Sequence, residues 1–283
     1  MLGKLLKYEF KATARMFLLM YAALLVLALI NAAVIPFNDG ALLGFLNSFE
    51  TLHSIITSLS MLSYVLVVTA VIILTLVIIV VRFYRMLGDQ GYLWFTLPVT
   101  SAQHIVSKLI CSFVWSIASM LMVGISVGVM ILPSGWLQEL WRIVDFWNYL
   151  VSLGFSPGIW LICALALLLT SWLSGILMFY VSMAIGPNLV KSRLGGSVLA
   201  YILFYIGTQI LGTFLLLFLS GPMTEQFSAL FGYSTGQTLE QTAAMINGIV
   251  ITTTVVFGMS FLAMAIACYF VTRHFLTKKL NLA

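Results

Sequence analysis

The sequence predicts an all-α integral membrane protein with six transmembrane helices. Of its 283 residues, 62% are hydrophobic and only 7% are charged, whereas a soluble globular domain has about 25% charged residues. The mean hydropathy of +1.14 agrees with a surface that faces lipid. Crossing a hydrocarbon core of about 30 Å takes about 20 apolar residues in a helix. Because lipid offers the backbone no hydrogen-bond partner, apolar segments of this length are expected to be helical.

Six segments are long and apolar enough to be such spans. They cover residues 16–35, 54–81, 104–132, 158–185, 197–219 and 248–271. The second and third exceed the minimum length, so we expect them to tilt or to protrude from the bilayer. The chain then divides into an N-terminal segment, residues 1–15, and a six-helix transmembrane domain, residues 16–283.

The distribution of charge predicts the orientation. With the N-terminus inside, 12 of the 13 Lys and Arg residues fall on the inner side and only Arg142 lies outside. This asymmetry is the positive-inside rule, so we expect a multi-pass protein of the cell membrane with both termini in the cytoplasm. It also accounts for the net charge of +5, and we expect no nucleic-acid partner.

Residues 1–15 are predicted to form an amphipathic elbow helix in the inner interface of the bilayer. Its basic residues share one stripe of the helix and would face anionic headgroups. They are Lys4, Lys7, Lys11 and Arg15. Glu9 lies near the apolar side, where lipid alone does not explain an acidic residue. Contact of Glu9 with another protein surface is one interpretation.

Residues 136–149, between the third and fourth spans, are predicted to form a helix along the outer interface. Apolar residues at positions 137, 140, 144, 147 and 151 have the spacing of one helix face. Trp and Tyr residues in this segment suit the aromatic belt of a bilayer. Anchoring in the interface is the simpler interpretation, and a role in gating a substrate is the alternative.

Signatures of catalysis and of cofactor binding are absent from the sequence. The three cysteines lie inside apolar runs and lack the spacing of metal ligands. No Gly-rich phosphate-binding loop occurs, so no nucleotide is expected on this chain. The central parts of the spans hold no Asp, Glu, Lys or Arg, which argues against an ion-coupled carrier. We assign no catalytic residue, no metal ligand and no cofactor.

The inner loop between the second and third spans has the most informative sequence. Asp89 can cap a short helix that runs through Phe95, and Pro98 prevents this helix from continuing far. Thr100 and Gln103 form a capping box that begins the third span. Large apolar side chains in this loop need cover from lipid headgroups or from a partner protein. They belong to Tyr92, Leu93, Trp94, Phe95 and Leu97.

This loop resembles the one in permease subunits of type-2 ABC exporters. In that family an acidic residue precedes Gly-Thr or Gly-Tyr, a Leu-rich turn, Leu-x-x-Pro-Val/Ile-Ser/Thr and a Lys in the next helix. The matching residues are Asp89, Gly91, Tyr92, Leu93, Leu97, Pro98, Val99, Thr100 and Lys108. The resemblance implies a coupling helix that docks on a cytoplasmic ABC ATPase subunit. The implied contacts are Gly88, Asp89, Gly91, Tyr92, Leu93, Trp94, Phe95, Leu97 and Pro98.

The same resemblance extends to the layout of the whole chain, with an elbow helix before six spans. It implies a second, smaller inner contact in residues 186–197, at Asn188, Lys191 and Arg193. It also implies that ATP and Mg²⁺ are bound by the partner subunit, and that two permease chains pair, most simply as a homodimer. The apolar run from Tyr92 to Phe95 departs from relatives whose coupling helix is more polar.

The sequence thus predicts a permease subunit of an ATP-driven exporter. Neutral spans suit an amphipathic or hydrophobic cargo, and a peptide is our best expectation. The alternative is a non-transporting membrane scaffold or sensor subunit that recruits a cytoplasmic partner through the same loop.

Overall fold

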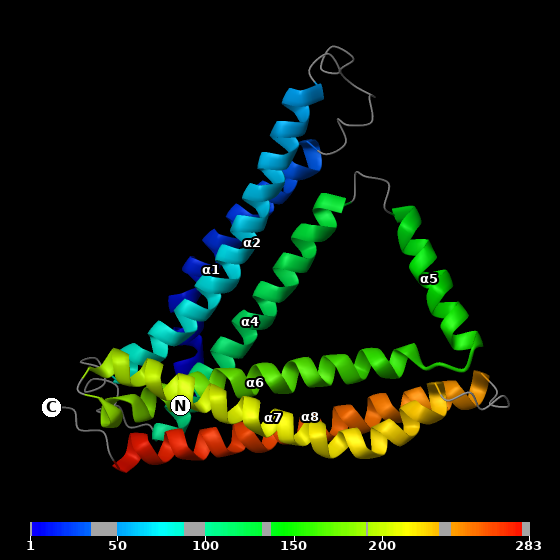
Figure 1. The fold of residues 1–283 in the computed structure, drawn as a ribbon. Coiled ribbons are helices and arrows are strands. Elements are labelled where there is room, and N and C mark those ends of the chain that lie inside the picture. Colours follow the sequence, from blue (N-terminus) through cyan, green and yellow to red (C-terminus); the bar gives the residue numbers. More distant parts are fainter. Residues whose placement is uncertain are drawn as a thin grey trace. The chain divides into compact units, whose positions relative to one another are not determined.

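The computed structural model describes residues 2–34, 50–87, 100–131, 137–190, 192–231 and 239–278. All regular secondary structure in these ranges is helical (Figure 1). Six of the described helices are long and apolar enough to cross a membrane. The predicted fold class, an all-α protein with six membrane-spanning helices, is therefore confirmed.

The six long helices extend beyond the predicted spans. Their bounds are α1 Leu2–Val34, α2 Glu50–Leu87, α4 Ser101–Ile131, α6 Pro157–Leu189, α7 Arg193–Phe231 and α8 Leu239–Lys278. The longest, α8, has 40 residues, whereas about 20 suffice for the hydrocarbon core. Hydropathy detects the part of a helix that suits lipid, but backbone hydrogen bonding continues the helix past it.

The N-terminal segment is not a separate element. Residues 2–15 and the first span form one unbroken helix, α1, so a distinct elbow helix is not confirmed. The predicted stripe of basic residues is nevertheless exposed. Its members are Lys4, Lys7, Lys11 and Arg15. On the opposite side, Glu9 and Thr13 are buried, so the amphipathic pattern of this segment is correct.

A helix is present in the segment that was predicted to lie along the outer interface; it is α5, Leu137–Ser152. It ends in a turn at Gly154, whose positive φ of 88° favours glycine. Ser156 precedes the first residue of α6, Pro157, a position that tolerates proline because its missing N–H has no helical partner. The predicted coupling helix falls within residues 88–99, outside the described residues.

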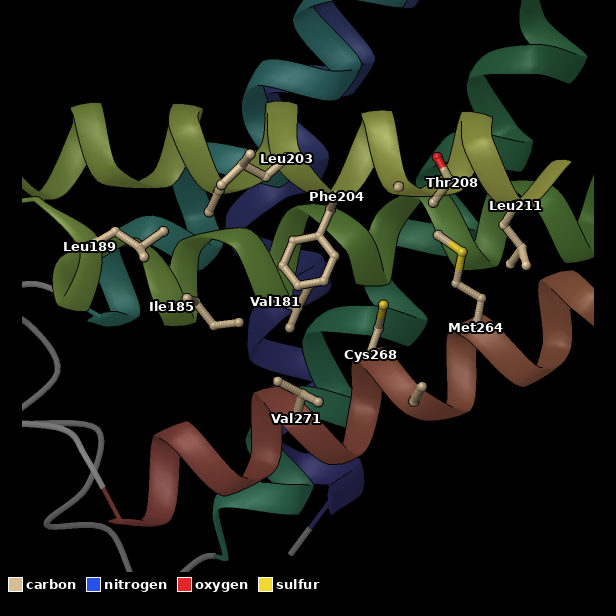
Figure 2. A pocket seen from close by; sticks show the side chains of 13 residues that line it. Val181, Ile185, Leu189, Leu203, Phe204, Thr208, Leu211, Met264, Cys268 and Val271 are labelled. Carbon is tan, nitrogen blue, oxygen red and sulfur yellow. The ribbon is translucent and has the colours of Figure 1, made fainter. Parts of the chain in front are cut away.

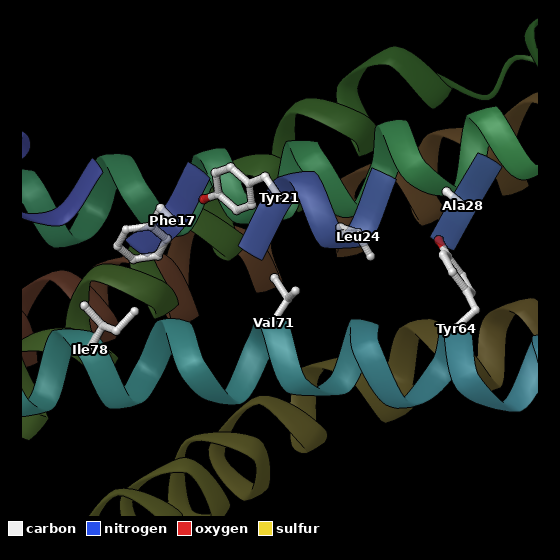
Figure 3. Packing of buried hydrophobic residues seen from close by; sticks show 7 residues of the cluster. All are labelled: Phe17, Tyr21, Leu24, Ala28, Tyr64, Val71 and Ile78. Carbon is white, nitrogen blue, oxygen red and sulfur yellow. The ribbon is translucent and has the colours of Figure 1, made fainter. Parts of the chain in front are cut away.

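The described helices form two compact units, with the boundary inside α5. Unit 1 contains α1, α2 and α4. Its apolar core is formed by side chains of α1 and α2, and Figure 3 shows these residues on the two helices. The core residues are Phe17, Tyr21, Leu24, Ala28, Tyr64, Val71 and Ile78. In α1 they recur every three or four residues, which places them on one helix face.

Unit 2 contains α6, α7 and α8, which lie side by side in Figure 1. At the turn between α6 and α7 the backbones nearly touch. A Cβ atom added to Gly186 would lie 2.4 Å from the backbone nitrogen of Ser197, and one added to Gly196 would lie 2.0 Å from the carbonyl oxygen of Gly186. Phe179 of α6 then stacks on Tyr201 of α7, with ring centroids 4.6 Å apart. Only glycine permits so close an approach at this crossing.

The order of contacts shows that helix direction alternates within each unit. In unit 1, Glu9 and Tyr21 of α1 meet Lys108 and Ser119 of α4 respectively, so α1 and α4 are parallel. In unit 2, residues near the beginning of α6 contact Asn247, which is near the beginning of α8. Alternation of three consecutive spans is what short connections across a bilayer require, and it supports the predicted segmentation.

Candidate functional site

Glu9 is a carboxylate buried among the helices of unit 1, with its side chain 2% exposed. Lys108 of α4 donates a hydrogen bond from Nζ to Glu9 Oε1 over 2.8 Å. The guanidinium of Arg82, from α2, pairs with Oε2. Because a buried charge without a partner costs several kcal/mol, these cations are what allow Glu9 to be buried. We call Glu9, Arg82 and Lys108 the Glu9 cluster.

The two cations of the Glu9 cluster belong to the two helices that the loop between the second and third spans joins. Arg82 is in the last two turns of α2, which ends at Leu87, and Lys108 is in the second turn of α4. The loop is therefore flanked by two helices that are bound to the same carboxylate. At the beginning of α4, the backbone N–H of Thr100 donates to Gln103 Oε1 over 3.4 Å. This contact is one half of the predicted capping box.

A row of polar and aromatic contacts continues from the cluster along α1 and α4. Trp115 donates from its indole Nε1 to Thr13 Oγ1 over 2.8 Å. Its ring stacks on Phe17, with centroids 4.4 Å apart. One turn further, the hydroxyl groups of Tyr21 and Ser119 lie 2.8 Å apart. Since residues four apart share a helix face, this row fixes α1 against α4 over several turns.

Hydroxyl pairs also join α2 to α4. Thr75 and Ser119 lie 3.0 Å apart, so Ser119 contacts both α1 and α2. Near the other end of these helices, the hydroxyl of Tyr64 lies 2.8 Å from Ser126 Oγ. Interhelical hydrogen bonds of this kind contribute to association in lipid, where apolar burial alone does not distinguish neighbours. Unit 1 is thus a three-helix assembly with polar contacts specifying its register.

Among the described residues of unit 2, Asn247 of α8 forms a comparable polar site. Its Oδ1 accepts hydrogen bonds from the indole Nε1 of Trp160 over 2.9 Å and from the backbone N–H of Ser156 over 3.2 Å. Its Nδ2 donates to the carbonyl oxygen of Gly154 over 3.3 Å. Asn247 thus holds the turn between α5 and α6 against α8. We interpret this site as structural.

The residues implied to contact an ATPase, Gly88 to Pro98, lie outside the described residues. Of the second inner contact, Asn188 is exposed near the end of α6 and Arg193 is half-buried at the beginning of α7. Lys191 lies outside the described residues. Asn188 and Arg193 flank the same tight turn, whose glycines bring α6 and α7 together.

Sequence reasoning recognised Glu9 as unusual but did not find its partners. Arg82 and Lys108 were assigned only to the inner surface, with Lys108 also part of the resemblance. The position of Glu9 near the apolar side of the helix is explained within this chain, because both of its ion-pair partners are intramolecular. The signal in the sequence was one acidic residue on an apolar helix face, together with two cations, Arg82 and Lys108, at the inner ends of other spans.

The Glu9 cluster is suited to holding three helices together. Its carboxylate is paired with two cations, Arg82 and Lys108, which come from two other helices. In the part of the chain that the structure describes, no group of three His, Cys, Asp or Glu residues could hold a metal ion. The chain matches no known protein family, and neither the curated proteins nor the solved structures include a significant match.

Proposed function

We propose that the chain is the membrane-spanning permease subunit of an ATP-driven exporter. A separate cytoplasmic ABC ATPase subunit binds the loop at residues 88–98, and the permease works as a dimer. ATP and Mg²⁺ are bound by the ATPase. The cargo is amphipathic or hydrophobic, and a peptide fits best the neutral interior of the spans.

The Glu9 cluster is the observation that carries this proposal. A loop that transmits force must be rigidly joined to the helices that it moves. Arg82 and Lys108 flank this loop, and both bind the carboxylate of Glu9. A displacement of the loop is therefore passed to α1, α2 and α4 together and is not absorbed by bending one of them. Buried ion pairs serve this purpose well because separating them is costly.

Co-purification tests the partner. We expect an ABC ATPase to be retained when the chain is purified from its native membrane, and to be lost from the double variant Leu93→Ala with Trp94→Ala. The matched control is Trp141→Ala with Ile143→Ala in α5, which also removes two large apolar side chains, both exposed. Loss of the ATPase from both double variants, or from neither, would contradict the assigned contact.

Reconstitution in vesicles tests the activity. The complex should hydrolyse ATP faster when amphipathic peptides are added, and it should move a labelled peptide only when ATP is present. Glu9→Gln should keep the ATPase bound but weaken the response to peptide, because the loop is no longer fixed to α1. A complex that binds the ATPase and transports nothing would favour the scaffold or sensor alternative.

A further inference from the structure

Two apolar surfaces of unit 2 are left uncovered by its own helices. One is a groove of about 470 Å³ among α6, α7 and α8 (Figure 2). The described residues that line this groove carry no charge, so its chemistry selects no particular occupant. The other surface belongs to α5, which is part of unit 2 from Ile143 onward. For α5 the structure shows which way the apolar side chains face.

Helix α5 is amphipathic. Val144, Trp147 and Val151 follow one another at intervals of three and four residues, so they share one side of the helix. At about 3.6 residues per turn, Arg142 and Asp145 lie on the other side. Every residue from 141 to 149 is exposed, so the described helices leave both sides largely uncovered. A helix with one apolar and one charged side is typical of a segment that lies in a membrane interface.

The indole ring of Trp147 shows the direction in which the apolar side faces. A Cβ atom added to Gly158, in the first turn of α6, would lie 3.9 Å from Cζ2 of this ring. Trp147 therefore reaches over the beginning of α6. Since α6 is long and apolar enough to cross the membrane, the side of α5 that faces α6 also faces the bilayer. The side that carries Arg142 and Asp145 then faces water.

The turn between α5 and α6 holds the end of α5 at the point where α6 begins. The backbone N–H of Phe155 donates to the carbonyl oxygen of Leu150 over 3.1 Å. Asn247 of α8 donates to the carbonyl oxygen of Gly154 and accepts a hydrogen bond from the backbone N–H of Ser156. Because this turn is bonded to α8 and leads directly into α6, α5 stays at the level where these two spans enter the bilayer.

Helix α5 is too short and too charged to cross the bilayer itself. Its 16 residues rise about 24 Å at about 1.5 Å per residue, less than a hydrocarbon core of about 30 Å. The side chains of Arg142 and Asp145 would be costly at the bilayer centre. Trp and Tyr side chains, such as Trp147 and Tyr149, are enriched at the boundary between membrane and water. The headgroup region therefore suits both sides of this helix.

We propose that α5 binds the bilayer interface at the beginning of α6, with its apolar side against the acyl chains and its charged side in water. The apolar side is formed by Val144, Trp147 and Val151. The leaflet is the outer one in the predicted orientation. This binding holds the turn, and with it the beginnings of α6 and α8, at a fixed depth in the bilayer. The proposal favours anchoring over the gating of a substrate, and it does not rest on the exporter function.

Spin labels on α5 test which medium covers each side. Single cysteines are introduced as Val144→Cys or Val151→Cys on the apolar side, and as Asp145→Cys or Tyr149→Cys on the charged side. The three native cysteines are changed to alanine, and the chain is placed in phosphatidylcholine nanodiscs. Electron paramagnetic resonance measures collisions of each label with oxygen, which concentrates in lipid, and with a water-soluble nickel chelate. Ile162→Cys, at an exposed position of α6, provides the reference for lipid.

The two sides should give opposite results. Labels at positions 144 and 151 should collide mainly with oxygen, as at position 162, and lie about 5–10 Å into the boundary between headgroups and acyl chains. Labels at positions 145 and 149 should collide mainly with the nickel chelate. Nickel collisions at all four positions would place α5 in water and overturn the proposal. Few collisions with either reagent at positions 144 and 151 would show that a protein surface covers the apolar side, which also overturns it.

Oxidative footprinting of the unmodified chain decides the question if the cysteine variants do not fold. Hydroxyl radicals are generated in the water around the nanodiscs, and mass spectrometry locates the oxidised side chains. Trp147 and Tyr149 are both exposed in the chain itself, and indole and phenol rings both react readily with these radicals. With α5 in the interface, Tyr149 should be oxidised far more than Trp147. Equal oxidation of the two side chains would reject the proposed orientation.

Discussion

The two units of this chain hold their helices together by different means. Unit 1 uses polar contacts between helices, from the Glu9 cluster to the hydroxyl pair of Tyr64 and Ser126. Unit 2 relies on close backbone approach at Gly186 and Gly196 and on aromatic stacking, and among its described residues Asn247 adds a polar contact between helices. In lipid both strategies are available, because small residues and hydrogen bonds replace the hydrophobic effect.

The difference matters for motion. Polar contacts have definite partners, so unit 1 has one preferred register and resists sliding. Apolar packing is less specific, so the helices of unit 2 can shift against one another at lower cost, and a groove can open between them. We therefore expect substitutions in unit 1 to act through lost partners, and substitutions in unit 2 to act through shape.

The largest effect should come from Glu9→Ala. Removing the carboxylate takes an ion-pair partner from both Arg82 and Lys108, and breaking a buried ion pair costs about 3–5 kcal/mol of stability. Unfolding in mixed detergent, followed by circular dichroism, measures the loss. Lys11→Ala is the control, because Lys11 is exposed on the same helix. Adding Lys108→Met to Glu9→Ala should recover part of the loss; no recovery would show that the ion pair is not its origin.

The corresponding change in unit 2 is Gly196→Ala. The added Cβ would lie 2.0 Å from the carbonyl oxygen of Gly186, so α6 and α7 must separate, at a cost of about 1–3 kcal/mol. The same unfolding measurement applies. Gly175→Ala in α6 is the control, since a Cβ there meets nothing within 4 Å. If both glycine variants have equal stability, the close approach does not hold unit 2 together.

A smaller loss is expected from Asn247→Ala, the polar exception in unit 2. The change removes three hydrogen bonds to the turn between α5 and α6 and one to Trp160 of α6, and it should cost about 1–2 kcal/mol. Protease sensitivity near Gly154 should rise, because that turn loses its attachment to α8. Asn188→Ala, at an exposed position, should leave cleavage unchanged. An unaltered cleavage rate in Asn247→Ala would mean that the turn is held by packing alone.

The smallest expected effect is that of Tyr64→Phe, which removes the hydroxyl that contacts Ser126. Interhelical hydrogen bonds in membrane proteins average about 0.6 kcal/mol, and we expect a loss of that size. Tyr8→Phe, at a side chain that is 70% exposed, provides the baseline. A loss above about 2 kcal/mol would indicate that the polar contacts of unit 1 act cooperatively and not one by one.

The sequence predicted the spans well because hydropathy depends only on local composition. It also placed Glu9 near the apolar side of the N-terminal segment, and it predicted a helix at α5 and the beginning of α4. Helix ends were predicted less well, since α7 continues through Gly221 and Pro222 to Phe231. Hydropathy falls there, but helical hydrogen bonding does not stop.

The partners of Glu9 could not be predicted from composition or periodicity. Arg82 follows Glu9 by 73 residues and Lys108 follows it by 99, and their meeting depends on how three helices pack. The same holds for Trp115, whose indole group contacts Thr13 and Phe17. A pattern within one helix shows which face is buried, but it does not show which side chain of another helix the face will meet.

The length of α8 has a practical consequence for imaging this protein. Its 40 residues amount to about 60 Å at about 1.5 Å per residue. A straight rod of that length, even when tilted by about 40°, still covers about 46 Å along the bilayer normal, more than the roughly 40–45 Å of bilayer with headgroups. One end of α8 must then emerge from a detergent micelle or nanodisc. In electron micrographs that projecting end would provide a landmark for aligning particles that are otherwise enclosed in a featureless belt.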